Sequence, residues 1–140
     1  LRIGIVLDQG SGVLRQLEPL AKWGIASPLG SGKQWTSWIH VADLARMFLF
    51  AATQPISSGP YNAVGPSPLT NKAFTKELCR ALRRPMIFPA VPGFALKLVL
   101  GEMATLALMS QKVSPTKIVD AGFTFQYSSA AQALQHIYGK

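Results

Sequence analysis

The stretch GKQWTSWIHVADLA, residues 32–45, contains the change of pattern that decides the fold. Residues 34–40 predict a short strand, and residues 41–53 follow as an almost entirely apolar helix. A helix that is apolar all round is normally covered by other elements, so we expect this one to be buried on most sides. Asp43 lies in its first turn, where a carboxylate can accept hydrogen bonds from free backbone N–H groups, and we expect it to be the cap.

His40 lies where this strand meets the helix, and the sequence leaves its role open. It is either a residue at the edge of a substrate cleft or a packed, hydrogen-bonded histidine. The other histidine, His136, is far away in the sequence, and no ligand pattern of known spacing accompanies either one, so no metal site is predicted. No nucleophile-elbow sequence supports a catalytic triad, and we name no catalytic residue.

Strands and helices alternate on both sides of this stretch. Residues 1–7 predict a continuous apolar strand, which should have a strand partner on each edge and cover on both faces. Pro19 should kink or break the helix that follows. The alternation predicts an α/β fold with at least part of its sheet parallel. The later elements are expected at these places: a strand at 61–64, a helix capped by Thr70 or Asn71, an extended piece at 85–91, an apolar helical stretch at 94–110, a short helix ending at Gly122, a strand at 123–127 and a last helix capped by Ser128 or Ser129.

Charge and cysteine content limit the class of partner. Fourteen Lys and Arg against six Asp and Glu give a net charge of +8, which favours anionic partners. The basic residues are mostly scattered and do not interleave with aromatic ones, so nucleic-acid binding is the less favoured reading. The single cysteine, Cys79, is expected to pack in the core and fits a reducing, cytoplasmic location. Lys97, Gly101 and Glu102 interrupt the most apolar run, so no membrane segment is expected.

Phosphate-binding loops are not recognisable in this chain. In GSGKQW, residues 30–35, a single residue separates the two glycines, and Gln34 follows the lysine where a P-loop needs Ser or Thr. No G-x-G-x-x-G opens a helix after a strand either. The residues themselves therefore predict neither a nucleotide loop nor a dinucleotide loop.

Four stretches in order resemble the extended short-chain dehydrogenase/reductases of the NAD-dependent epimerase/dehydratase superfamily. They are SWIHVADLARMF at 37–48, the strand at 1–7, Gly-Pro-Tyr-Asn at 59–62 and Asn-Lys-Ala-Phe at 71–74. The resemblance implies the C-terminal portion of a Rossmann-like doubly wound fold with a small mixed α/β substrate-side domain. It also implies that the dinucleotide loop and the catalytic Tyr-x-x-x-Lys pair precede the strand with which this chain begins.

A narrower resemblance covers essentially the whole chain. The runs at 28–40, 62–75 and 100–127 are similar to the sugar nucleotide epimerase or cell-division-inhibitor-related family, whose members end in a domain of unknown function. It implies two parts, residues 1–88 from the Rossmann-like domain and residues 89–140 as the family-specific domain.

The resemblance also implies which residues face the ligands. The cofactor, NAD or NADP, is expected near the first strand, and a small-molecule substrate such as a sugar or nucleotide sugar near the second. Thr36 stands where many nucleotide-sugar enzymes have an arginine that grips the diphosphate, which argues against a UDP-sugar. The cofactor-side residues are Arg2, Gly4, Ile5 and Val6, and the substrate-side residues are Gln34, Trp35, Trp38 and His40.

The resemblance implies that this chain is part of an epimerase or oxidoreductase and is inactive alone. Two further function classes remain possible. One is a nonenzymatic regulatory or binding protein on the same scaffold, because a fold does not determine a function. The other, less favoured, is a basic nucleic-acid-binding module. Without the preceding strands, strand 1–7 should keep at least one unpaired edge, so we expect this chain alone to self-associate through it or to aggregate unless partner chains cover it.

Overall fold

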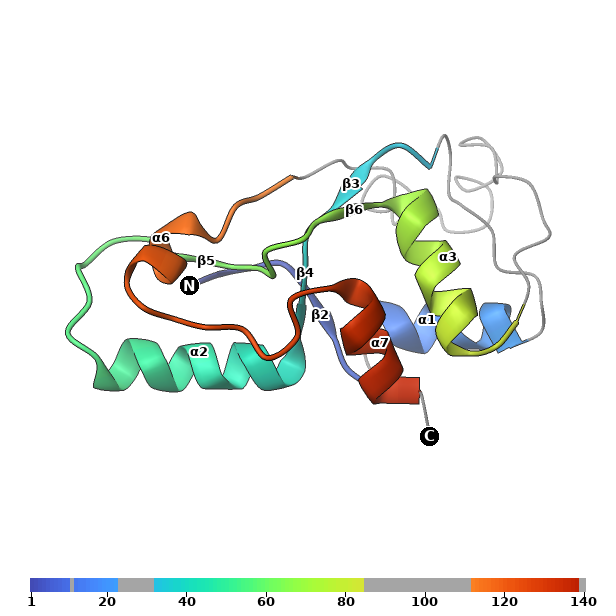
Figure 1. Cartoon of the computed structure of the whole chain (residues 1–140), viewed down its shortest axis with the longest axis horizontal. Helices are drawn as coiled ribbons and strands as arrows, with labels where there is room; N and C mark the ends of the chain where they lie inside the picture. Colours follow the sequence, from blue (N-terminus) through green and yellow to red (C-terminus); the bar gives the residue numbers. More distant parts are fainter. Residues whose placement is uncertain (11, 23–31, 85–111, 139–140) are drawn as a thin grey trace.

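The computed structural model describes residues 1–10, 12–22, 32–84 and 112–138 (Figure 1). The extended piece expected at 85–91 and the apolar helix at 94–110 lie outside these residues. Strands and helices are mixed along the chain, which confirms the predicted α/β class. The elements are β1 Arg2–Ile3, β2 Ile5–Leu7, α1 Gly12–Lys22, β3 Trp35–Thr36, β4 Trp38–His40, α2 Val41–Thr53, β5 Asn62–Ala63, β6 Leu69–Thr70, α3 Asn71–Ala81, α6 Thr116–Asp120 and α7 Ala130–Tyr138.

The strand predicted at 1–7 is divided at Gly4 into two short strands with different partners. β1 pairs in parallel with β5, and β2 pairs in parallel with β4. The Gly4 N–H donates to the Ala63 carbonyl at 3.2 Å, and the next N–H, that of Ile5, donates to the Ser37 carbonyl at 2.9 Å. A Cβ at Gly4 would lie 2.7 Å from the Ser37 oxygen and 2.7 Å from Val64 Cγ1. Only glycine therefore lets the two parallel pairs meet here.

The strand predicted at 34–40 is likewise divided, at Ser37. β3 pairs antiparallel with β6, whereas β4 runs beside β2. The Ser37 hydroxyl oxygen accepts a hydrogen bond from the Val113 N–H at 2.9 Å. This hydrogen bond connects Val113, in the C-terminal part of the chain, to the junction of β3 and β4.

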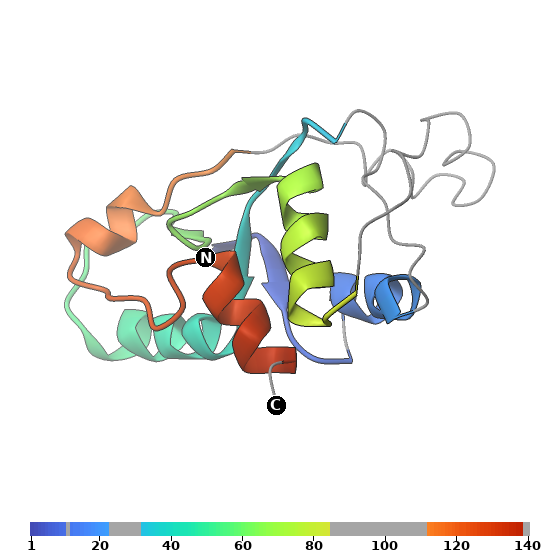
Figure 2. The same ribbon diagram turned by 45° about the vertical axis from the view of Figure 1, so that its right-hand side comes forward.

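Two cores lie on the two faces of β4, because successive side chains of a strand point to opposite faces. Trp38 belongs to the first core, with residues from α1, α3 and α7, and Ile39 to the second core, with residues from α2, β5 and α6. Figure 2 shows α2 and α6 on one side of the molecule and α1 and α3 on the other. Cys79 packs in the first core as predicted. The first core is Leu7, Leu14, Ala21, Trp38, Phe74, Leu78, Cys79, Ala130, Ala133, Leu134 and Ile137, and the second is Ile39, Met47, Tyr61, Ala63, Ile118 and Phe123.

The expected burial of the first strand and of helix 41–53 is wrong for the part of the chain that the structure describes. Leu1, Ile3 and Ile5 are 40%, 50% and 37% exposed. On α2, Phe48 and Leu49 are 49% and 64% exposed. The apolar character of these segments was recognised correctly, but apolar residues become buried only where another element covers them.

Two smaller predictions concern α1 and residues 123–127. α1 continues through Pro19 to Lys22, so the break expected as one alternative near Glu18 is wrong, and the other alternative, a kink, stays a prediction. Residues 123–127 form no strand, because Asp43 binds the backbone N–H groups of Gln126 and Tyr127. The side chains of Thr70 and Ser129 do cap their helices, accepting hydrogen bonds at 3.3 Å from the Ala73 and Gln132 N–H groups.

Among the helices that the structure describes, none combines the length and apolar character needed to span a membrane.

Candidate functional site

The carboxyl ends of β2 and β4 lie side by side, since Leu7 is in register with His40. Open α/β sheets bind ligands at the carboxyl ends of their parallel strands, so this edge is the first place to look for a site. Residues from distant parts of the sequence meet here. We call this group the strand-end cluster: His40, Asp43, Tyr127 and His136.

His40 is buried and holds three neighbours at once. It is 2% exposed, and its Nδ1 accepts a hydrogen bond from the Ala42 N–H at 3.0 Å, which caps α2. Its ring stacks on Tyr127, with the centroids 4.1 Å apart. Its Nε2 lies 3.2 Å from His136 Nδ1. The structure shows His40 packed and hydrogen-bonded, and its place at the edge of a substrate cleft stays a prediction.

The contacts of His40 determine where its proton lies. Because Nδ1 accepts from a backbone N–H, the neutral ring carries its proton on Nε2 and donates it to His136. Burial and the neighbouring His136 lower the pKa of His40, while Asp43 and Asp8 oppose that shift. His40 is therefore neutral at pH 7, and its polar atoms are used within the protein.

Asp43 has another role than the cap predicted from the sequence. Its side chain is fully buried, and its two oxygens accept hydrogen bonds from the Gln126 and Tyr127 N–H groups, both at 2.9 Å. Arg46 donates to the same carboxylate at 2.8 Å and also to the Thr124 carbonyl at 3.0 Å. His40 caps α2, so the Asp43 carboxylate is not needed as a cap and instead binds the backbone of residues 126 and 127. These hydrogen bonds hold Tyr127 where its ring stacks on His40.

The predicted substrate-side residues lie along one segment, residues 34–40, on or beside β3 and β4, and they differ in exposure. Trp38 is fully buried, and its Nε1 donates to the Ser67 carbonyl at 2.9 Å. Gln34 is 8% exposed, whereas Trp35 is half-buried, with Lys112 Nζ 4.3 Å from its ring centroid. Trp35 is therefore the one of these four residues whose ring offers substantial surface.

The predicted cofactor-side residues all lie along β1 and β2. Arg2 is exposed, and its backbone N–H donates to the Tyr61 carbonyl at 2.7 Å. Gly4 forms the tight junction, Ile5 is partly exposed and Val6 packs against the second core. The four residues follow one another along the same segment, but they differ in exposure and in the groups that they contact.

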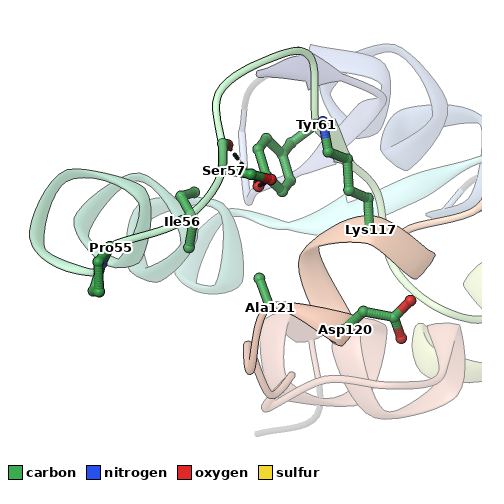
Figure 3. Close-up of a pocket in the computed structure, with 7 residues that line it drawn as sticks. All are labelled: Pro55, Ile56, Ser57, Tyr61, Lys117, Asp120 and Ala121. Atoms are coloured by element: carbon green, nitrogen blue, oxygen red, sulfur yellow. Dashed lines mark hydrogen bonds between the residues drawn. The ribbon is translucent and has the colours of Figure 1, made fainter.

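A shallow pocket of about 330 Å³ lies elsewhere, between the end of α2 and α6 (Figure 3). Tyr61 is held there by Ser57, because its hydroxyl donates to the Ser57 carbonyl at 2.8 Å and lies 2.9 Å from the Ser57 Oγ. Lys117 Nζ lies 4.3 Å from the Tyr61 ring centroid and donates to the Pro60 carbonyl at 3.1 Å. Sequence reasoning missed this group, because Tyr61 and Lys117 are far apart in the chain.

The chemistry of this pocket does not match that of a catalytic tyrosine. Lys117 contacts the face of the Tyr61 ring and a backbone carbonyl, so both residues are engaged in packing. Tyr61 immediately precedes β5, which places the pocket at the amino end of that strand. The strand-end cluster lies at the opposite, carboxyl end of the parallel pairs. Among the described residues, no group of three His, Cys, Asp or Glu could hold a metal ion.

Comparisons with known proteins agree with this geometry. Residues 91–137 match a family described as a domain of unknown function (DUF1731). The chain is 40% identical, over 99% of its length and 46% of the relative's, to the Staphylococcus aureus (strain MRSA252) epimerase family protein SAR0825. It is 42% identical, over 98% of its length and 39% of the relative's, to the Arabidopsis thaliana epimerase family protein SDR39U1 homolog, chloroplastic. The chain thus spans about half the length of the curated relatives it matches.

Solved structures give the same result for the fold. The human epimerase family protein SDR39U1 (isoform 2), solved with NADPH, superposes with a TM-score of 0.92 at 31% identity, over 99% of this chain and 47% of that one. A UDP-N-acetylglucosamine 4-epimerase from Bacillus cereus has a TM-score of 0.73 at 16% identity, over 98% of this chain and 45% of that one, which supports the fold alone. The neighbours confirm a Rossmann-like epimerase scaffold.

Proposed function

We propose that this chain, a homologue of the epimerase family proteins, supplies the substrate-side part of an NAD(P)-dependent epimerase or oxidoreductase. The observation that carries the proposal is the similarity over 99% of the chain to a protein whose structure contains NADPH. The 140 residues contain neither a glycine-rich dinucleotide loop nor a Tyr-x-x-x-Lys pair, so other residues must supply both. We expect this chain alone to be inactive.

The first strand is the cofactor-side element in this proposal. This segment is partly exposed among the described residues, and at Gly4 its backbone passes close to both neighbouring strands. It contains the four residues predicted on the cofactor side, Arg2, Gly4, Ile5 and Val6. A nicotinamide cofactor, when bound, exchanges a hydride with an alcohol or ketone carbon of the substrate. These residues would hold the cofactor's nicotinamide end, while the phosphates bind elsewhere.

Trp35 is the substrate-contacting residue that we propose on this side. Its ring is half-buried, and Lys112 Nζ lies over it at 4.3 Å from the centroid, so the proposed contact with an apolar ligand surface uses the part of the ring that stays exposed. Trp38 and His40 act as positioning residues, because both are buried and hydrogen-bonded within the protein. Thr36 lacks the charge that would grip a diphosphate, so we propose a substrate other than a UDP-sugar.

A chimaeric protein tests the proposal. The matched residues of the Staphylococcus aureus protein are replaced by this chain, and NADPH and NADH binding is measured by calorimetry for the chimaera and for this chain alone. We expect the chimaera to bind a nicotinamide dinucleotide and this chain alone to bind none. A folded, monodisperse chimaera that binds neither NADPH nor NADH would refute the proposal.

Trp35→Ala in the same chimaera tests the substrate side. We expect the KM for the substrate identified by screening sugars and other small alcohols to rise about tenfold or more, with cofactor binding unchanged. Val119→Ala, an exposed apolar residue on α6, is the matched control and should leave both quantities unchanged. A chimaera that binds cofactor but turns over no compound of the panel would instead favour the nonenzymatic alternative.

A further inference from the structure

The exposed face of α3 carries a row of positive charges. Lys72, Lys76 and Arg80 are all exposed, and their spacing of i, i+4 and i+8 places them on one face of the helix. Arg83 and Arg84 follow at the end of the helix and are exposed as well. We call Lys72, Lys76, Arg80, Arg83 and Arg84 the basic row of α3.

This arrangement works against the stability of the helix. Like charges at i and i+4 repel each other, and the row contains two such pairs, Lys72 with Lys76 and Lys76 with Arg80. Lys72 also lies in the first turn, where the helix dipole favours acidic side chains, and that turn contains none. Glu77, whose Oε1 lies 3.5 Å from Arg80 Nη1, is the one acidic residue on α3. Helix stability can explain Arg80, near the negative end of the dipole, but it does not explain the row as a whole.

Arg83 ends the helix in a backbone conformation that favours another residue. Its φ is 57°, in the left-handed region, and no other described residue except glycine has a positive φ. The Arg83 N–H donates to the Arg80 carbonyl at 3.1 Å, and the Arg84 N–H donates to the Cys79 carbonyl at 2.9 Å, which is the Schellman arrangement of a helix end. Glycine usually occupies this position, because it has no Cβ. The arginine therefore adds a positive charge to the row and strains the backbone.

The surroundings of the row distinguish between classes of partner. The apolar face of α3 is buried in the first core, and the large apolar residues that are exposed in the described part of the chain lie on or beside β1, β2, α2 and α6. The row therefore offers no apolar side chain that could insert into a lipid surface. The one aromatic residue of α3, Phe74, is buried, so the row offers no ring on which a nucleic-acid base could stack. Binding at this face depends on charge, which favours an acidic polypeptide.

A second copy of this chain does not carry a complementary row of acidic residues. No two of its six Asp and Glu are fewer than ten positions apart in the sequence, so none share one face of a helix within two turns. They are Asp8, Glu18, Asp43, Glu77, Glu102 and Asp120. The complementary charges must therefore come from a different polypeptide.

We infer that the basic row of α3 binds an acidic segment of another protein, in which Asp or Glu recurs at each helical turn. Lys72, Lys76 and Arg80 are about 6 Å apart along the helix axis, because each residue advances the helix by about 1.5 Å. An acidic helix alongside α3 has its carboxylates at the same interval when they occur at i, i+4 and i+8. Arginine can bind a carboxylate through two N–H groups, and lysine binds it as a point charge. This interaction is independent of the proposed function, because it requires neither cofactor nor substrate.

Peptides of defined charge spacing test the inference. This chain is immobilised on a biosensor surface, and the probe is an alanine-rich helical peptide with Glu at i, i+4, i+8 and i+12. One control peptide has Gln at these positions, and the other has the same number of Glu at i, i+2, i+5 and i+7. We expect the probe to bind at least about tenfold more tightly than either control. Raising the salt concentration from about 50 to about 500 mM should weaken its binding at least about tenfold, because salt screens exposed charges.

Charge substitutions separate binding from stability. Lys76→Glu reverses the charge in the middle of the row and should weaken binding of the probe at least about tenfold. Lys117→Glu is the matched control and should change the affinity less than about twofold, because Lys117 is an exposed lysine on α6, which lies away from α3 in Figures 1 and 2. Arg83→Gly should weaken binding about twofold to fivefold and yet raise the melting temperature, because glycine relieves the backbone strain. Circular dichroism of each variant confirms folding before binding is measured.

Three outcomes would overturn the inference. The first is equal binding of the probe and the two control peptides. The second is equal weakening by Lys76→Glu and by Lys117→Glu in folded variants. The third is tighter binding of a single-stranded DNA of about 12 nucleotides, or of phosphatidylserine vesicles, than of the probe, with the same loss in Lys76→Glu, which would make phosphate groups the ligand.

Discussion

The first core and the outer surface of α2 use the same kinds of residue in opposite ways. We call the exposed residues Ala45, Phe48, Leu49 and Ala52 the outer stripe of α2. Leu78, in the first core, is completely buried, while Leu49, on the outer stripe, is 64% exposed. The first core is enclosed by α1, α3 and α7, whereas the described residues cover α2 on one face only. Equal apolarity thus leads to burial on the side that α1, α3 and α7 enclose, and to exposure on the face of α2 that no described element covers.

Truncating one leucine in the first core and one on the outer stripe should show the largest difference between the two regions. Leu78→Ala should lower the free energy of unfolding by about 2–5 kcal/mol, because it leaves a cavity in a packed core. Leu49→Ala, the same chemical change on the outer stripe, should cost less than about 0.5 kcal/mol. Urea unfolding followed by circular dichroism measures both, and similar losses would show that the outer stripe is already covered.

Removing the charge of Asp43 tests whether residues 124–127 depend on α2 for their position. Asp43→Asn should cost about 2 kcal/mol, since the amide keeps one acceptor but turns its NH₂ group toward a buried backbone donor. The exposed Asp120→Asn serves as the control and should change stability by less than about 0.5 kcal/mol. Equal effects of the two variants would contradict the anchoring role.

The N-caps of α2 and α3 also differ, because α2 is capped by an imidazole and α3 by a hydroxyl. α3 is capped by the Thr70 hydroxyl, and Thr70→Ala should cost about 1 kcal/mol at every pH. Thr70→Ser keeps the hydroxyl and should restore most of that loss. A thermal unfolding series measures all three proteins, and a loss that varied with pH would argue against a simple hydroxyl cap.

α2 is capped by a titrating group, so its side of the molecule should respond to acid. The pKa of His40 is lowered in the folded protein, which means that the folded state binds fewer protons than the unfolded state. Its stability contribution is therefore complete above the unfolded pKa of about 6.5 and is lost as the pH falls toward the folded value. Two-dimensional NMR of the imidazole C–H signals should show His40 titrating below its ordinary range.

Burial is the main cause of the lowered pKa of His40, and His136→Gln tests the second cause, the neighbouring imidazole. Removing the neighbouring imidazole should raise the pKa of His40 toward its ordinary value and reduce the loss of stability in acid, although burial continues to oppose protonation. A wild-type His40 that titrates at or above the ordinary value would contradict the arrangement.

Much of the architecture was predictable from local patterns. The alternation of strand and helix, the start of α3 at Thr70 and the apolar character of the first strand all follow from residues close together in the sequence. The divisions at Gly4 and Ser37 were not predictable, because each arises from a change of strand partner. The strand expected at 123–127 is absent because a carboxylate 80 or more positions away takes its backbone donors.

The candidate site was predictable only in part. The sequence placed His40 at the end of a strand, but it assigned the helix cap to Asp43, which binds residues 126 and 127 instead. His136 joins His40 from 96 positions away, and no spacing rule connects them. The predicted ligand-facing roles remain proposals for experiment.

By itself, the sequence determined the class of the fold, since side-chain periodicity and caps act over a few residues. Only the tertiary structure decided which apolar faces are closed, what His40 and Asp43 bind, and where the first strand changes partner. These outcomes depend on contacts between distant segments, and the free energy of such contacts is determined by what packs against a residue. The exposed outer stripe of α2 is the clearest case, because its residues are as apolar as a core and lack only a neighbour among the described residues.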